Sequence, residues 1–230
     1  MKIYFRITLP AILSVLAMSI SLFLGGCSAT ETKQAVVGDK VETYRSNYTG
    51  EKQVLVVGEF DNRSDYLQGI FSTGNVLGDQ AKAILKAHLQ QTNRFSVVDR
   101  ENMARLKEEA EISGVEQSLV GARYAVTGAV SEFGRKVTGD QKLFGILGSG
   151  RTQTAYSKVT LNVVDIVTSE IVYSTQGAGE YSLSEEEILG FGSSAGYDST
   201  LNGKVLNYSV TQAVDNLVAD LQGGVWNINP

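Results

Sequence analysis

The single cysteine of this chain is the feature that most limits how it can fold. Cys27 follows an apolar run from Ile7 to Leu24, and Lys2 and Arg6 precede that run. A basic start, an apolar stretch and small residues directly before a cysteine are typical of a lipoprotein signal, in which the cysteine is acylated and becomes the new N-terminus. No thiol then remains for a disulfide, so the mature chain depends on its own core for stability.

This signal divides the sequence into three parts. Residues 1–26 form a signal peptide, residues 27–50 a lipidated tether and residues 51–230 the folded domain. The tether is polar, has no apolar periodicity, and is expected to become ordered only against a neighbour. Because Ser28 rather than Asp follows the cysteine, we expect sorting to the outer membrane, with the main domain in the periplasmic space.

Charge and length exclude some classes of function. Removing Lys2 and Arg6 with the signal changes the formal net charge from −5 to −7, and no basic stripe is left to bind nucleic acid. About 200 mature residues suit one compact domain with extensions. No other segment reaches the ~18 apolar residues of a membrane helix, so any further entry into a membrane has to use strands.

The apolar pattern predicts strands that alternate with helices, which is an α/β (α+β) fold class. The expected strands are Val54–Val57, Arg94–Val98, Tyr124–Val130, Val159–Ile166 and Ile171–Ser174. The expected helices are Asn75–Gln91, a helix capped by Asp99 with Met103, Leu106 and Ala110 on its apolar side, and Leu201–Gln222. Trp226 and Ile228 are expected to fold back onto the sheet.

Two long detours leave this framework. The first, about residues 131–158, turns at Gly145–Gly150 and predicts one long hairpin whose arms project beyond the domain sheet. The second runs over about residues 177–200 and turns near Gly190–Gly192. The chain therefore carries two hairpin extensions.

The connection from Glu59 to Gly74 is much longer than the roughly 2–6 residues that usually join a strand to a helix. It carries two aromatic side chains, Tyr66 and Phe71, which an ordinary solvated loop has no reason to display. We predict that these residues carry the function. The alternative, that both pack onto their own domain, stays open.

No catalytic or metal site can be completed from the motifs present. Ser194 is the centre of Gly192–Gly196, a nucleophile-elbow pattern, but the only histidine, His88, precedes it and is expected to be a packed residue. Gly145–Gly150 lacks the lysine and hydroxyl of a phosphate-binding loop, and Glu185–Glu187 alternate between the faces of a strand. We therefore expect no enzyme activity, cofactor or metal.

Several segments follow the lipoprotein signal in an order and spacing that is more specific than any one of them. They are Val54–Phe60, Tyr66 with Phe71–Thr73, Phe95–Arg100, Tyr124–Val130, Val159–Asp165 and Thr168–Ile171. In these segments the chain resembles the CsgG/HfaB family, the curli-secretion channel lipoproteins. The resemblance covers nearly all of the mature chain.

The resemblance implies an anticodon-binding-domain-like sheet with flanking helices, and two long hairpins that each copy contributes to one oligomeric transmembrane β-barrel. In the curli channel, a loop narrows the pore with rings of tyrosine, asparagine and phenylalanine. Tyr66, Ile70 and Phe71 match these positions, with Ile70 in place of the asparagine. The implied partners are other copies in a ring, outer-membrane lipid, a secreted unfolded or amyloid-type subunit, and periplasmic accessory proteins.

Two functions follow from the resemblance, and the polarity of the hairpins leaves both open. The first is an oligomeric pore that exports unfolded subunits or anchors a surface polymer. The alternative is a periplasmic adaptor lipoprotein that binds an envelope assembly or a cell-wall synthase without forming a pore. Phe133 and Val137 share a face with Arg135, and a cation on a lipid-facing strand costs ~2–4 kcal/mol at the bilayer midplane.

Overall fold

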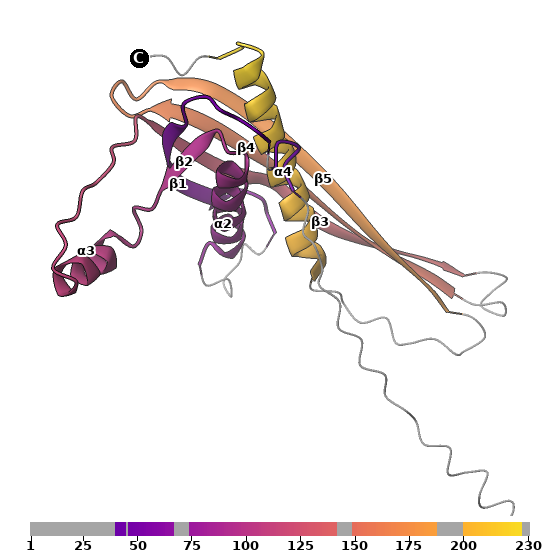
Figure 1. Cartoon of the computed structure of the whole chain (residues 1–230). Helices are drawn as coiled ribbons and strands as arrows, with labels where there is room; N and C mark the ends of the chain where they lie inside the picture. Colours follow the sequence, from indigo (N-terminus) through magenta and orange to yellow (C-terminus); the bar gives the residue numbers. More distant parts are fainter. Residues whose placement is uncertain (1–39, 45, 67–73, 142–148, 188–199, 227–230) are drawn as a thin grey trace, which may run out of the picture. The chain divides into compact units, whose positions relative to one another are not determined.

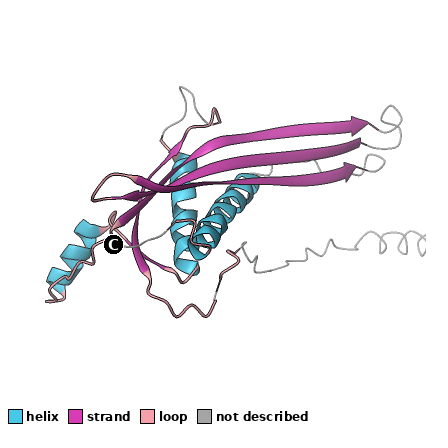
Figure 2. Cartoon of the chain, turned by 90° about the horizontal axis from the view of Figure 1, so that it is seen from above, coloured by secondary structure: helices cyan, strands magenta, loops and turns pink. Residues whose placement is uncertain are grey.

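The computed structural model describes residues 40–44, 46–66, 74–141, 149–187 and 200–226. These residues form one mixed sheet with two helices packed on one of its faces (Figures 1 and 2). The strands are β1 (Gln53–Asn62), β2 (Phe95–Val98), β3 (Tyr124–Gln141), β4 (Ser149–Asp165) and β5 (Ile171–Glu187). The helices are α2 (Val76–Gln91), α3 (Met103–Ile112) and α4 (Thr200–Gln222). The α/β class predicted from the sequence is confirmed.

The strand order in the sheet is β2-β1-β3-β4-β5. β1 runs parallel to both β2 and β3, whereas β3, β4 and β5 form an antiparallel meander. α2 supplies the crossover between the parallel strands β1 and β2, as such connections require. α2 therefore packs on the parallel half of the sheet, whereas α4 packs on β4 and β5 of the antiparallel half, whose strands continue beyond it.

The core lies between the sheet and the helices α2 and α4. Alternate residues of β1, including Leu55 and Val57, point into it, and so do Val126 of β3 and Leu161 of β4. The predicted helical stripes supply the other side, with buried residues Leu77, Ala81, Leu85 and Leu89 in α2 and Leu201, Val205, Leu206, Val210, Ala213, Val214, Leu217 and Val218 in α4. One apolar cluster holds the domain together.

β3, β4 and β5 continue past the core as a ribbon. β3 and β4 pair from Tyr124↔Asp165 to Gln141↔Ser149, so the two arms of the hairpin expected over about residues 131–158 lie side by side. Most of its expected turn at Gly145–Gly150 lies outside the described residues. β5 pairs with β4 along its whole length, out to Glu187↔Ser149. The described arm of the second expected extension, residues 177–187, thus belongs to the same ribbon, while its expected return lies outside the described residues.

Helix α3 differs from the sequence prediction at its start and in its packing. It follows Asn102, whereas Asp99, the expected cap, accepts hydrogen bonds from the Glu101 amide and from the Asn102 side chain in the preceding turn. None of its residues is buried, and Leu106 is 46% exposed. The expected apolar stripe has nothing to pack against because α3 stands away from the sheet (Figure 1).

The segment before β1 contacts its own domain rather than only a neighbour. Val41 is buried in the core cluster, and the Glu42 amide donates to Asp215 Oδ1 in α4. Arg94 lies over the ring of Tyr48 at 4.9 Å and donates to Ser46 Oγ. The described residues of the expected tether therefore pack onto the domain.

The C-terminal end folds back as expected for Trp226. Its ring stacks on Tyr173 of β5 with the centroids 5.0 Å apart, and its indole N–H donates to the carbonyl of Leu217. Ile228 lies outside the described residues. No helix in the described ranges is long and apolar enough to cross a membrane.

Candidate functional site

Two asparagine side chains close the neck of the long loop between β1 and α2. Asn75, just before α2, donates from Nδ2 to the Phe60 carbonyl at 2.6 Å and accepts from the Asn62 amide through Oδ1 at 2.9 Å. Asn62, the last residue of β1, accepts from both the amide and the hydroxyl of Ser64 and donates from Nδ2 to the Tyr66 carbonyl at 2.8 Å. The neck is fixed because these side chains satisfy backbone groups at both ends of the loop.

Tyr66 lies at the base of the ribbon. Its ring contacts Phe133 of β3 with the centroids 4.7 Å apart, and its hydroxyl accepts from Asn202 Nδ2 of α4 at 3.4 Å. Tyr66 thus connects the loop with the strand and the helix that flank the start of the ribbon. The other predicted loop residues, Ile70 and Phe71, lie outside the described residues, as does Cys27.

Two glycines allow Phe60 to occupy its position beneath the neck. A Cβ on Gly128 of β3 would lie 2.5 Å from the Phe60 ring, and one on Gly78 of α2 would come still closer to the Phe60 carbonyl. Any larger residue would therefore clash with the strand that leads into the loop. The register of β1 against β3 shifts between Val57 and Phe60, which turns Phe60 into the core.

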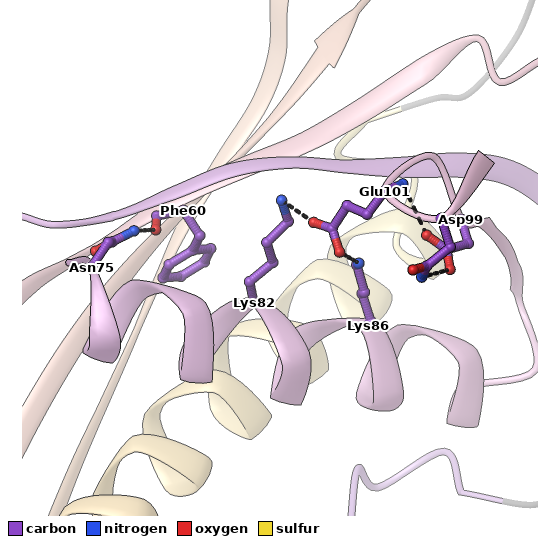
Figure 3. A network of polar contacts seen from close by, with 7 residues as sticks. Phe60, Asn75, Lys82, Lys86, Asp99 and Glu101 are labelled. Carbon is purple, nitrogen blue, oxygen red and sulfur yellow. Dashed lines mark hydrogen bonds and ion pairs between the residues drawn. The ribbon is translucent and has the colours of Figure 1, made fainter. Parts of the chain in front are cut away.

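The turn between β2 and α3 is tied to α2 by an ion-pair network (Figure 3). Lys82 and Lys86 of α2 both contact the carboxylate of Glu101, and these two hydrogen-bonded cations lower the pKa of Glu101. A hydrogen bond from the Asn102 side chain lowers the pKa of Asp99 in the same turn. The network fixes the point from which α3 leaves the domain.

Both edges of the ribbon are satisfied within the chain up to two adjacent rows of residues. On the β3 edge, the last contacts are the pair Asn62↔Val130 and the bond from the Arg63 amide to the Val130 carbonyl. On the β5 edge, α4 side chains cover the backbone: Gln212 accepts from the Ala178 amide at 2.6 Å and Asn216 donates to the Gln176 carbonyl at 3.0 Å.

Val130 lies in the row Val159↔Gly177, and Ala178 lies in the next row, with Lys158 and Glu132, so the two edges reach this limit in adjacent rows. Beyond it, residues 133–141 of β3 and 179–187 of β5 border no further strand among the described residues. Open strand edges of matched length are templates for pairing with another chain. They are the candidate site of assembly.

The two faces of the outer ribbon differ in polarity. On the side of the helices the register aligns Val137, Ala155 and Leu183 with Arg135 and Gln153. On the other side, hydroxyls bond across the strands in the pairs Thr154–Ser182 at 2.9 Å and Thr152–Ser184 at 3.1 Å, next to Lys136 and Glu180. One face is thus partly apolar, and the other is polar except for the ring of Tyr156, which lies over Gly134.

The polar face continues down the sheet, where no helix covers it (Figure 2). A hollow of about 300 Å³ lies there, lined by Glu59, Asp61, Arg63, Thr127, Gly128, Ala129, Ser131, Thr160 and Asn162. Asp61 and Arg63 form an exposed ion pair at 3.7 Å. Apart from the Tyr156 side chain, the described face is polar from this hollow to the ribbon.

His88 is a packed residue, as the sequence analysis expected. It is 4% exposed between α2 and α4, with Nε2 beside Asn207 Oδ1 at 2.8 Å and Thr211 Oγ1 at 3.0 Å. Within the described residues, no group of three histidine, cysteine or carboxylate side chains is placed to hold a metal ion.

The sequence analysis missed the neck residues Asn62 and Asn75. The available signal was their position, one asparagine at each end of a loop bounded by a strand and a helix, where such side chains often bond to the backbone.

Comparison with known proteins gives three findings. The family described as curli production assembly/transport component CsgG matches residues 40–229. A protein of Neisseria meningitidis serogroup B named "putative lipoprotein" is 52% identical over 217 residues, which cover 94% of this chain and 97% of the relative.

Among solved structures, the PelC dodecamer from Paraburkholderia phytofirmans aligns with a TM-score of 0.35 at 16% identity, covering 78% of this chain and 93% of that one. Lipoprotein GNA1162 from Neisseria meningitidis aligns with a TM-score of 0.33 at 15% identity, covering 73% and 99%.

Proposed function

This chain belongs to the family of the curli production assembly/transport component CsgG, and on that premise we propose that it is an outer-membrane lipoprotein that closes with other copies into a ring-shaped export pore. Its cargo is an unfolded polypeptide subunit, and its acylated Cys27 holds it to the membrane. The observation that carries this proposal is that both ribbon edges lose their strand or helix partners in adjacent rows of the described chain.

The open edges support assembly because a solitary ribbon leaves backbone groups unpaired. Closing several ribbons side by side satisfies those groups and removes the edges, which is the condition for strands to enter lipid. The 17-residue strand β4 is about 55 Å long at ~3.3 Å per residue, so its outer half reaches the length of a tilted membrane strand.

The two faces of the outer ribbon suit the two surroundings that a membrane pore has, lipid on its outside and water in its lumen. In a closed ring the face with the half-exposed Val137 turns to lipid, and the hydroxyl face with Thr154 and Ser182 lines a hydrated lumen. Arg135 on the apolar face lies two residues from Phe133 at the base of the ribbon, where the bilayer interface lowers the cost of a cation.

The loop supplies the constriction in this proposal. Tyr66, Ile70 and Phe71 of every copy converge on the axis and hold an extended chain by transient apolar and stacking contacts. Asn62 and Asn75 fix the neck from which this loop departs. A single pore lined in this way admits unfolded chains and excludes folded ones.

A proline scan of the β3 edge tests the assembly. The Ala178 amide points away from β4, so the backbone N–H and C=O of its row partner Lys158 point towards β3 and bond to Glu132. Backbone groups alternate in direction along a strand, so those of the odd-numbered residues of outer β3 point to the open edge. Val137→Pro removes one outward N–H and leaves the bonds to β4 in place, whereas Thr138→Pro breaks them.

We expect the detergent-extracted wild-type lipoprotein and Val137→Ala to form rings in electron micrographs, and Val137→Pro to stay folded but monomeric. A monodisperse wild-type monomer would remove the pore. Rings formed equally well by Val137→Pro would remove this edge from the interface.

The second candidate is an adaptor lipoprotein whose ribbon stays in water and binds an envelope assembly. It is favoured by the packing of Tyr66 against Phe133 and Asn202 of its own domain. This packing holds the tyrosine side chain on its own subunit and not at the axis of a pore. Planar-bilayer recordings separate the two. Under the pore proposal, Tyr66→Ala with Phe71→Ala raises single-channel conductance; under the adaptor proposal, no channel is recorded with either protein.

A further inference from the structure

The end of the domain away from the ribbon exposes an unusual share of apolar side chains. Most of the exposed large apolar residues in the described ranges belong to two segments there. One is an arm formed by α3 and residues 113–122, with Ile112, Val115, Leu119 and Val120 exposed by 53% or more. The other is the β4–β5 turn, where Val167 is 77% exposed and Ile171 57%.

The two segments are joined at the start of β3. The Ile166 amide of the turn donates to the Arg123 carbonyl at the foot of the arm, and Arg123 pairs with Asp165 at 3.1 Å. The register places this row, Tyr124↔Asp165, at the opposite end of the sheet from Gln141↔Ser149 (Figure 1). The apolar surface is thus far from the open ribbon edges.

The arm is held at its root and uncovered beyond it. Glu101 is pinned to Lys82 and Lys86 just before α3, and Arg100 Nη2 donates to the Val120 carbonyl at 2.5 Å. Exposed apolar side chains on an arm with a fixed root indicate an interaction surface. Apolar surface in contact with water is unfavourable, and a partner that covered it would be stabilised by its burial.

The charge of this surface selects its occupant. Residues 103–122 carry two cations, Arg105 and Lys107, against the four carboxylates of Glu108, Glu109, Glu111 and Glu116, a sum of −2. Arg100 before α3 and Glu170 in the turn add no net charge to this sum, and Arg123 forms an ion pair with Asp165. An acidic border repels an anionic membrane and also the same border on a second copy.

We propose that this end is a docking surface for a segment of another protein that is apolar and flanked by lysine or arginine. The exposed aliphatic side chains of the arm and the turn cover its apolar face, and the glutamates of the arm face its cations. The proposal goes beyond the pore and does not depend on it, since the surface and the ribbon lie at opposite ends of the sheet.

The test uses the full lipoprotein in nanodiscs of zwitterionic lipid, with empty nanodiscs as blanks. The probe is a fluorescent helical peptide of leucine and lysine, and its partner peptide has glutamate in place of lysine. The test variant is Ile112→Ser/Val115→Ser/Leu119→Ser, which changes three exposed side chains and no charge. The matched control is Val76→Ser, which changes a 60% exposed valine on α2.

We expect the lysine peptide to bind wild type and the control alike, more weakly as salt rises, and the triple variant about tenfold more weakly or worse, because burial of apolar side chains is lost. The glutamate peptide should not bind. Equal binding of the lysine peptide to wild type and triple variant overturns the proposal, and so does equal binding of both peptides.

Two further outcomes name a different occupant and also overturn it. One is self-association of the wild-type protein that the triple substitution abolishes, which would make a second copy the occupant. The other is flotation of the wild type, but not of the triple variant, with phosphatidylglycerol vesicles. Unchanged thermal unfolding of the triple variant excludes misfolding as the cause of any loss.

Discussion

Asn75 and Phe60 lie fifteen residues apart in the sequence and are joined by a 2.6 Å hydrogen bond from Asn75 Nδ2 to the Phe60 carbonyl (Figure 3). The same side chain accepts from the Asn62 amide, so one amide group takes the place of a short stretch of strand pairing at the end of β1. The loop that carries Tyr66 therefore starts and ends at a fixed neck.

Replacing Asn75 should destabilise the protein. Asn75→Ala removes the hydrogen bonds that Asn75 makes with the Phe60 carbonyl and the Asn62 amide, and we expect a loss of about 1–3 kcal/mol in the free energy of unfolding. Urea denaturation measures it, with Gln80→Ala, an exposed position on α2, as the control expected within about 0.5 kcal/mol of wild type. Equal stability of the two variants would show that the neck contributes nothing.

Gly128→Ala should disrupt the packing of Phe60. The added methyl group would lie 2.5 Å from both the Phe60 ring and the Thr160 carbonyl, and overpacking of this kind costs about 1–3 kcal/mol or more. Gly121→Ala, where no atom lies within 4 Å of the new methyl group, is the matched control. Denaturation midpoints compare them, and Phe60→Leu should partly restore the Gly128→Ala variant because it removes ring atoms from the clash.

Tyr173 should make the protein lose stability in alkali. Burial, and then the hydrogen bond to Asp220, raise the pKa of Tyr173 to about 12, from an ordinary value of about 10. Since the folded state favours the neutral phenol, this contribution is complete below pH about 10 and is lost as the pH rises towards 12.

Tyr173→Phe keeps the ring against Trp226 but has no proton to lose. Its free energy of unfolding should therefore fall less steeply than that of wild type between pH 10 and 12. Parallel pH profiles for the two proteins would contradict the assignment.

Removing the α4 side chains that cover the β5 edge should promote association. Gln212→Ala with Asn216→Ala uncovers the Ala178 amide and the Gln176 carbonyl and extends the open edge towards the core. Light scattering at rising concentration should show aggregation that wild type lacks under the same conditions. The control is Gln90→Ala, which uncovers the Val97 amide on the four-residue strand β2 and should aggregate less because that edge is short.

The regular elements could be predicted because apolar residues recur in each of them at the spacing of a helix or a strand. The helices expected at 75–91 and 201–222 are found at 76–91 and 200–222, since their apolar stripes recur at helical spacing and both stripes face one core. The loop after β1 was expected to begin at Glu59, but the strand continues to Asn62. The last four residues of β1 are Glu59, Phe60, Asp61 and Asn62, and only Phe60 is apolar. A strand end with so many polar residues has the composition of a loop, so the apolar pattern alone did not predict it.

Helix α3 shows where periodicity misleads. Met103, Leu106 and Ala110 have helical spacing, yet the helix buries none of its residues. A stripe predicts a helix, but whether it becomes core depends on whether another element lies opposite, and that is not encoded in the stripe itself.

The helices, the core strands, the paired arms of β3 and β4 and the family could be read from the sequence, because they depend on apolar spacing and on the order of segments along the chain. The fold was needed to show that β5 joins these arms in one ribbon and that asparagine side chains close the loop. It was also needed to show that the ribbon edges open in adjacent rows and that α3 stands away from the sheet. Each of these features depends on contacts between residues far apart in the chain. The backbone groups that remain without a strand partner are known only once the register of the strands is known.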